Sequence, residues 1–262
     1  MVKEFRQVLS KLSPPMILKD RKYQLTGGLL CLLLVFTAFT FQSGFDLPDS
    51  CEQIILVSAD DWSSTTGSLL LLEKKKNQWD TVSTATTVNF GKNGLKWGRG
   101  LHANQEANEK QEGDGCAPVG VFELGLAFGY NEQPAGVSWP YQQLTDRDYF
   151  VDDINSKDYN TWQTISMDEA NDPKSKWGSF ERMKRNDHLY ELGIVVKHNE
   201  DPIVKGMGSA IFLHVERAPG LPTLGCTSMQ KADLLEVMQW LDFSKNPLFI
   251  QMPKEQLSQI VW

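Results

Sequence analysis

An apolar run that ends on a histidine, followed by a tight turn that carries a cysteine, constrains this chain more than any other feature. The run is Gly208-Ser209-Ala210-Ile211-Phe212-Leu213-His214, and Cys226 follows within Pro222-Thr223-Leu224-Gly225-Cys226-Thr227. The run predicts a buried strand, and the Pro/Gly-rich turn predicts that the chain returns beside the end of that strand. Such an arrangement can bring a thiol and an imidazole base together, as nucleophilic cysteines require. The pattern therefore indicates Cys226 as a nucleophile and His214 as its base.

The first 43 residues predict where the chain works. No charged residue occurs from Tyr23 to Phe45, and six Lys or Arg residues precede this stretch. As a helix its 23 residues would span about 34 Å, long enough to cross a bilayer. We expect residues 1–43 to be a signal peptide or an N-terminal membrane anchor, with residues 23–45 inserted in or crossing the membrane. Met16 is an alternative start. Residues 44–262 would then lie outside the cytoplasm, in the periplasm.

The charge is distributed unevenly. The whole chain carries −7, whereas the leader has six basic and two acidic residues, so the remainder carries −11. A surface this acidic argues against nucleic acid or anionic lipid as the partner of residues 44–262. That part of the chain is long enough to bury a full core as one domain.

Three cysteines follow the leader, namely Cys51, Cys116 and Cys226. In an oxidising compartment an odd number leaves at least one thiol unpaired or paired between chains. We expect a Cys51–Cys116 disulfide, which would leave Cys226 free. The alternative is that Cys116 lies near Cys226 and forms a regulatory disulfide with it.

Short apolar and β-branched runs predict a mainly β fold of the α+β kind. We expect strands over residues 53–57, 68–72, 79–90, 118–126, 192–197, 209–215 and 247–251. The spacing of Leu234, Leu235, Met238 and Leu241 predicts one helix over residues 231–241. Residues 101–112 are expected to be a helix or a loop, and Gly113-Asp114-Gly115 a tight turn before a strand.

A long polar stretch spans residues 130–190. It contains Trp139, Trp162 and Trp177, and disordered segments are poor in such aromatic residues. We therefore interpret the stretch as an insertion or lid, in which the tryptophans form either its core or a wall for the substrate.

Two ordered blocks resemble the L,D-transpeptidase catalytic-domain family, over about residues 53–250. The segment 112–122, Glu-Gly-Asp-Gly-Cys-Ala-Pro-Val-Gly-Val-Phe, is similar to the family's "small residue, Pro, x, Gly, x, Phe" pattern. Residues 209–214 together with 223–227 are similar to its His…Ser/Thr-His-Gly-Cys signature. Leu224 occupies the usual place of a second histidine, and Ser228-Met229 replaces the common Arg/Asn ending.

The resemblance implies a β-sandwich or barrel in which Cys226 and His214 meet in a cleft and act on peptidoglycan stem peptides. In that family the cysteine attacks the carbonyl between an L-centred and a D-residue, then passes the acyl group to an amine on another stem. Gly225 permits close approach of the backbone, so amides near Cys226 could hold a developing oxyanion. Thr223 and Thr227 are expected to support the same turn. Catalysis through a thioester requires no cofactor.

Other functions are compatible with the same residues. One is a hydrolase on this scaffold, an L,D-carboxypeptidase or endopeptidase, in which water replaces the amine; the other is a non-catalytic wall-binding protein. The presence of both His214 and Cys226 weakens the last. His102, His188 and His198 lack the compact spacing of zinc ligands. No metal is expected.

Overall fold

The structure is a computed structural model that describes residues 44–76 and 78–262. The expected signal peptide or anchor and the alternative start Met16 therefore lie outside the described residues. Within the described ranges, no helix has the length and apolar character needed to cross a membrane.

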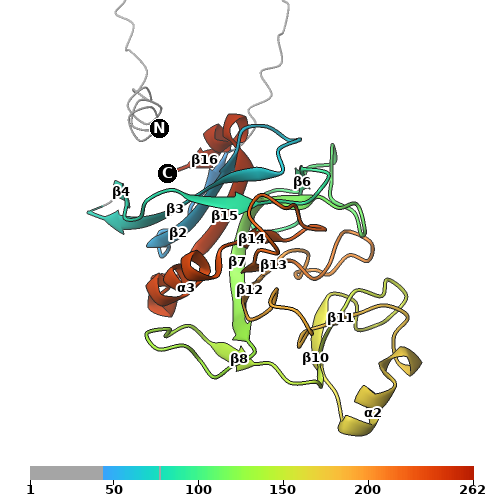
Figure 1. The fold of residues 1–262 in the computed structure, drawn as a ribbon. Coiled ribbons are helices and arrows are strands. Elements are labelled where there is room, and N and C mark those ends of the chain that lie inside the picture. The colour runs from blue at the N-terminus through green and yellow to red at the C-terminus, as the bar shows by residue number, and fades with distance from the viewer. Residues whose placement is uncertain (1–43, 77) are drawn as a thin grey trace, which may run out of the picture. The chain divides into compact units, whose positions relative to one another are not determined.

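Most strands belong to one eleven-stranded sheet that closes on itself as a barrel (Figure 1). Around the ring the order is β12, β13, β14, β5, β3, β2, β15 and β7, and β7 pairs back onto β12. The bounds of these strands are β2 Gln53–Ala59, β3 Thr66–Lys75, β5 Thr86–Asn89, β7 Ala117–Gly129, β12 Leu192–Val196, β13 Phe212–Val215, β14 Thr227–Met229 and β15 Leu248–Pro253. The predicted mainly β fold is confirmed.

The strands β2 and β15 form the most deeply buried part of the barrel. All seven residues of β2 and all six of β15 are buried. They pair in parallel, with β3 antiparallel on the far side of β2 and β7 antiparallel on the far side of β15. A strand covered on both faces needs an unbroken apolar run rather than an alternating one, which is the pattern of the segment Ile-Ile-Leu-Val in β2.

Two predicted strands differ from those observed. The segment 79–90 is divided into β4 (Gln78–Thr81) and β5, which pair with opposite ends of β3, while the Ser83 hydroxyl accepts the Leu71 amide between them. The strand expected over 209–215 begins only at Phe212, because Ala210 has a φ of +54°, which no strand residue adopts. The other five predicted strands are present. Residues 101–112 contain no helix, so the loop alternative holds there.

The polar stretch has a small sheet of its own. β9 (Asp148–Val151) pairs with β10 (Thr161–Thr164) and β11 (Glu181–Arg182), and the short helix α2 (Met167–Asn171) follows β10. These elements group together away from β2, β3 and β15 (Figure 1). The earlier part of the stretch joins the barrel, because β8 (Tyr141–Gln143) pairs with β7.

The three tryptophans of this stretch have different surroundings. Trp177 packs with Tyr149, Val151 and Ile165 in the core of the small sheet. Trp139 instead packs against Phe243 with the rings tilted, and its indole donates to the Gly125 carbonyl of β7. Trp162 is half-buried against Phe128, in the apolar cluster beneath Cys226. The core interpretation is thus correct for Trp177, and Trp162 is the one nearest the candidate site.

The remaining elements surround the barrel. The predicted helix is α3, Lys231–Trp240, which follows β14 and buries Leu234, Val237 and Met238. β6 (Leu95–Trp97) pairs in parallel with β7, and β1 (Phe45–Asp46) pairs with β16 (Ile260–Val261). Short 3₁₀ turns cover Pro173–Ser175, Phe243–Lys245 and Lys254–Gln259.

Candidate active site

Strand pairing places His214 and Cys226 on neighbouring strands of the barrel. β13 and β14 are parallel, with Leu213 opposite Thr227 and His214 opposite Ser228. Cys226 immediately precedes β14, and its Sγ lies 3.4 Å from the amide nitrogen of Phe212, two residues before His214. Its side chain packs against the cluster that contains Tyr190, and the Tyr190 ring contacts the His214 imidazole. The two side chains therefore share Tyr190 as a neighbour.

The sulfur of Cys226 lies between two backbone groups. Sγ accepts from the Phe212 amide at 3.4 Å and donates to the Ala210 carbonyl at 3.4 Å. The side chain also packs against an apolar cluster that includes Phe128, Tyr190 and Phe212. Burial raises the pKa of the Cys226 thiol to about 12, the Phe212 amide opposing this in part. At neutral pH the resting sulfur is therefore a thiol.

His214 is neutral and has a defined tautomer. Its Nδ1 lies 2.8 Å from the Val215 carbonyl, and because a carbonyl only accepts, Nδ1 must carry the ring proton. Nε2 then has a lone pair. Burial lowers the pKa of the imidazole to about 4. The resting pair is thus thiol and imidazole rather than thiolate and imidazolium, and Nε2 can act as a base.

The turn before Cys226 is closed by the Thr223 hydroxyl. It donates to the Cys226 carbonyl at 2.6 Å and accepts the Gly225 amide at 3.0 Å. Gly225 has a φ of +152°, and a Cβ there would lie 3.2 Å from the Cys116 carbonyl oxygen, so glycine is required for both reasons. Because the Gly225 amide already has a partner, it is not a free oxyanion donor.

The Thr227 side chain lies inside the barrel and not in the turn before Cys226, where it was expected. Its hydroxyl is buried and donates to Gln251 Oε1 at 2.7 Å, inside the barrel. It therefore anchors the start of β14 to β15. The Cys226 amide, in contrast, has no hydrogen-bond partner in the part of the chain that the structure describes, which leaves it available to an oxyanion.

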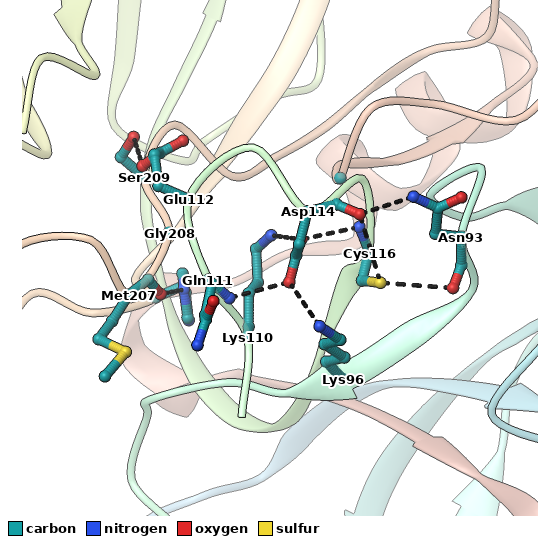
Figure 2. Close-up of polar contacts among 12 residues, drawn as sticks. Asn93, Lys96, Lys110, Gln111, Glu112, Asp114, Cys116, Met207, Gly208 and Ser209 are labelled. Carbon is teal, nitrogen blue, oxygen red and sulfur yellow. Dashed lines mark hydrogen bonds and ion pairs between the residues drawn. The ribbon is translucent and has the colours of Figure 1, made fainter. Parts of the chain in front are cut away.

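A buried ion pair beneath the turn was not identified from the sequence. The Lys110 side chain is 4% exposed and its Nζ donates to Asp114 Oδ1 at 2.8 Å (Figure 2). Asp114 also accepts the amides of Gln111 and Cys116 and lies 3.6 Å from Lys96. Lys110 Nζ would be 3.6 Å from a Cβ at Gly225. The i,i+4 spacing of Lys110 and Asp114 was visible in the sequence, but their burial was not.

The expected Cys51–Cys116 disulfide is wrong, since all three cysteines of the described residues are free. Cys51 precedes the start of β2 and Cys116 precedes the start of β7, and the register through β15 places these points at opposite ends of the sheet. The offset is about ten residues, or roughly 30 Å, far beyond the reach of a disulfide. Cys116 lies instead beside the turn that precedes Cys226, and its thiol donates to the Asn93 carbonyl (Figure 2).

An aromatic and ionic cluster flanks His214. The Tyr190 ring meets the imidazole edge to face at 5.6 Å between centroids, and the Arg185 guanidinium lies over the Tyr190 ring at 5.1 Å. Arg185 is held by Asp187 and Glu181. These three charged residues line a shallow hollow with Phe180, Arg182 and Asn186. Arg185 connects this hollow to Tyr190, and through Tyr190 to the His214 ring.

The other histidines are occupied by backbone groups. His102 and His198 are buried, and each accepts one amide and lies within hydrogen-bond distance of one carbonyl. His188 Nε2 lies 3.0 Å from the Glu216 carbonyl. No group of three or more His, Cys, Asp or Glu residues arranged to hold a metal ion occurs within residues 44–76 and 78–262.

Comparison with known families gives one match over most of the chain. The sequence model of the L,D-transpeptidase catalytic domain matches residues 53–250, a range that includes β2, His214, Cys226 and β15. Among curated proteins, no sequence matches this chain significantly.

Among solved structures, the chain is similar to "Structure of Bdellovibrio bacteriovorus Bd1075". The likeness has 11% identity and a TM-score of 0.37, and covers 77% of this chain and 48% of that one. The chain thus spans about half the length of that protein. At this TM-score we conclude nothing from the likeness.

Proposed function

This chain belongs to the L,D-transpeptidase catalytic-domain family, and on that premise we propose that it is a cysteine acyltransferase acting on peptidoglycan stem peptides. Cys226 is the nucleophile and His214 is the base. The observation that carries the proposal is the His214 tautomer: Nδ1 is committed to the Val215 carbonyl, so Nε2 keeps a lone pair that can take a thiol proton, and Cys226 packs on the cluster whose Tyr190 contacts His214.

The first half-reaction acylates the enzyme. Nε2 of His214 takes the proton from Sγ as sulfur attacks the carbonyl that joins an L-centred residue to a terminal D-residue. The carbonyl oxygen becomes an oxyanion, to which the Cys226 amide can donate. Collapse of this intermediate breaks the C–N bond, and the imidazolium returns its proton to the departing amine. A thioester and a free D-amino acid result.

The second half-reaction regenerates the thiol. A side-chain amine of another stem attacks the thioester carbonyl, and His214 accepts the proton that the amine loses. Expulsion of sulfur forms the new amide, and the same proton returns to Sγ. With water as the acceptor the product is a trimmed stem, so the scaffold alone does not fix the acceptor.

The separated pKa values of the two groups fit this cycle. A thiol with a pKa of about 12 and an imidazole with a pKa of about 4 do not exchange a proton at rest. Transfer becomes favourable as carbon–sulfur bond formation removes the negative charge from sulfur. Because stem peptides lie in the cell wall, we further propose that residues 44–262 work outside the cytoplasm.

Intact-protein mass spectrometry with a stem tetrapeptide tests the proposal. We expect the native protein to gain the mass of the acyl group with loss of the terminal D-residue, and Cys226→Ala to gain nothing. Cys51→Ala is the matched control and should acylate normally, because Cys51 lies at the far end of β2. An adduct that persists in Cys226→Ala would exclude Cys226 as the nucleophile.

A second arm of this experiment identifies the acceptor. Adding a diamino-acid stem to the acylated protein should give a cross-linked peptide if the protein is a transpeptidase. Release of free tripeptide at the same rate with and without this amine would instead assign a hydrolase.

A further inference from the structure

Ala210 has a backbone conformation that L-residues avoid. Its φ is +54°, in the left-handed region, which costs an alanine roughly 1–2 kcal/mol. The residue lies between the loop that follows β12 and the start of β13, and its carbonyl is one of the two partners of Cys226 Sγ. Strained residues persist only where their surroundings hold them, and they are frequent at functional sites.

The group that holds Ala210 is the side chain of Asn160. This side chain comes from the loop between β9 and β10, and the residue is 4% exposed. Its Oδ1 accepts the Ala210 amide at 3.2 Å, and its Nδ2 donates to the carbonyls of His198 at 2.9 Å and Asn199 at 2.8 Å. The side-chain amide of Asn160 thus makes all three of these hydrogen bonds to one segment, residues 198–210.

The same segment is fixed at neighbouring points. Ser209 Oγ donates to Glu112 Oε2 at 2.6 Å (Figure 2), and the Tyr159 hydroxyl donates to the same oxygen at 2.6 Å. Asn199 Nδ2 donates to the carbonyls of Val204 and Gly208. Several side chains therefore fix the residues that precede Ala210. The hydrogen bond to Ala210 itself comes from Asn160.

The two backbone partners of Sγ favour opposite states of the sulfur. The Ala210 carbonyl can only accept, so it favours the protonated thiol, whereas the Phe212 amide donates and favours the thiolate. If the Ala210 carbonyl turned away, the contact that favours the thiol would be lost, and the Phe212 amide, which favours the thiolate, would remain. The conformation of Ala210 thus affects both the position and the protonation of the nucleophile.

We propose that Asn160 is a positioning residue for Cys226: by holding Ala210 in the left-handed region, it aims the Ala210 carbonyl at the sulfur and keeps the resting thiol protonated and correctly placed. The proposal rests on Cys226 being the nucleophile of the proposed function. It also gives the polar stretch a role, since the insertion supplies this residue to the site.

The test is alkylation of Cys226 by iodoacetamide between pH 6 and 10, with each cysteine followed by peptide mapping. In Asn160→Ala we expect the curve of alkylation rate against pH for Cys226 to shift to lower pH, so that its rate at pH 8 rises about 3- to 10-fold, the value of one hydrogen bond. Acylation by the stem tetrapeptide should fall about 10- to 100-fold, because the sulfur is misplaced. Because unfolding would also speed alkylation and slow acylation, the other two cysteines and the Ala210 variants serve as controls for it.

Substitutions at Ala210 change the other partner of the hydrogen bond with Asn160. Ala210→Val should reproduce both changes, because a β-branched residue is strongly disfavoured in the left-handed region. Ala210→Gly should follow the native curve, because glycine adopts this φ freely. Asn155→Ala, in the same loop but exposed, is the control for Asn160.

Cys51 and Cys116 report on unfolding, since both are buried in the native protein. If all three cysteines become reactive in Asn160→Ala, this variant has unfolded. The comparison of Ala210→Val with Ala210→Gly then tests the proposal in its place. The proposal is overturned if Ala210→Val, or a folded Asn160→Ala, gives the native alkylation curve for Cys226. Alkylation does not depend on acyl transfer, so failure of the proposed function alone would leave this result intact.

Discussion

The barrel strands β2 and β15 and the segments that surround Cys226 are held together by different forces. In the barrel, Ile54, Ile55, Phe249 and Ile250 are 0% exposed and are joined by continuous strand pairing. Around Cys226, single side chains such as Asn160, Asp114 and Thr223 bond to backbone groups of irregular segments. Apolar burial is distributed over many contacts, whereas these hydrogen bonds are few and directional.

The difference has a consequence for substitution. Loss of an apolar side chain from the barrel should weaken the whole domain, because the strands unfold together. Loss of one polar side chain near Cys226 should release a local segment while the barrel persists. The following three predictions test this contrast.

Phe249→Ala should produce the largest change. The ring is fully buried and lies 6.2 Å from the ring of Phe122 on the neighbouring β7. Its removal leaves a cavity, and we expect the free energy of unfolding to fall by about 3–5 kcal/mol in urea denaturation. Hydrogen exchange should speed up throughout the barrel.

Phe243→Ala is the matched control for the barrel. Phe243 is 66% exposed, so its loss should change the free energy of unfolding by less than about 1 kcal/mol. Equal losses for the two variants would contradict the dominance of barrel burial.

Acidification should produce the next largest effect, and His214 contributes to it together with the buried His198 and His102. Burial lowers the pKa of the His214 imidazole in the folded protein to about 4 from 6.5. Between these values the unfolded state binds the extra proton, so the free energy of unfolding falls as the pH falls. At pH 4 the loss due to His214 should reach about 3 kcal/mol relative to pH 7.

His214→Asn isolates this contribution. Asparagine can still donate to the Val215 carbonyl but does not titrate, so its free energy of unfolding should depend less steeply on pH between 6.5 and 4. His188→Asn, at an exposed position, is the matched control for the substitution. A native slope in His214→Asn would show that this imidazole is not neutral and buried as described.

Asp114→Asn should produce the smallest of the three effects and a local one. Burial alone would raise the pKa of the Asp114 carboxyl, but Lys110 and the amides of Gln111 and Cys116 hold it below its usual value. The substitution removes the charge of the carboxylate that pairs with Lys110 but keeps an acceptor oxygen, at a cost of about 1.5–3 kcal/mol, the value of hydrogen bonds between charged groups. Hydrogen exchange should rise at residues 110–116 and leave β2 protected.

Asp80→Asn is the control, because Asp80 is exposed on β4 and its loss should change the free energy of unfolding by less than about 0.5 kcal/mol. Faster exchange in β2 of Asp114→Asn would mean that the ion pair supports the barrel as well.

The same contrast explains which elements were predictable. Apolar runs predicted β2, β7, β12 and β15, because strand burial is a property of consecutive residues. The segment 79–90 was wrongly predicted as one strand, since its Thr and Val residues favour strands on both sides of the break at Ser83. The Cys51–Cys116 pairing failed because spacing along the chain carries no information about opposite ends of a sheet.

The sequence by itself determined that the chain is mainly β and that His214 precedes a turn with Cys226, because both depend on local patterns of apolar residues, glycine and proline. Only the tertiary structure decided that Asn160, Lys110 and Asp114 lie around Cys226 and the turn that precedes it. In sequence these residues resemble ordinary surface positions, since Lys, Asp and Asn are mostly exposed in proteins. Their burial depends on distant segments meeting, and a buried polar group is tolerated only where those segments supply its hydrogen-bond partners.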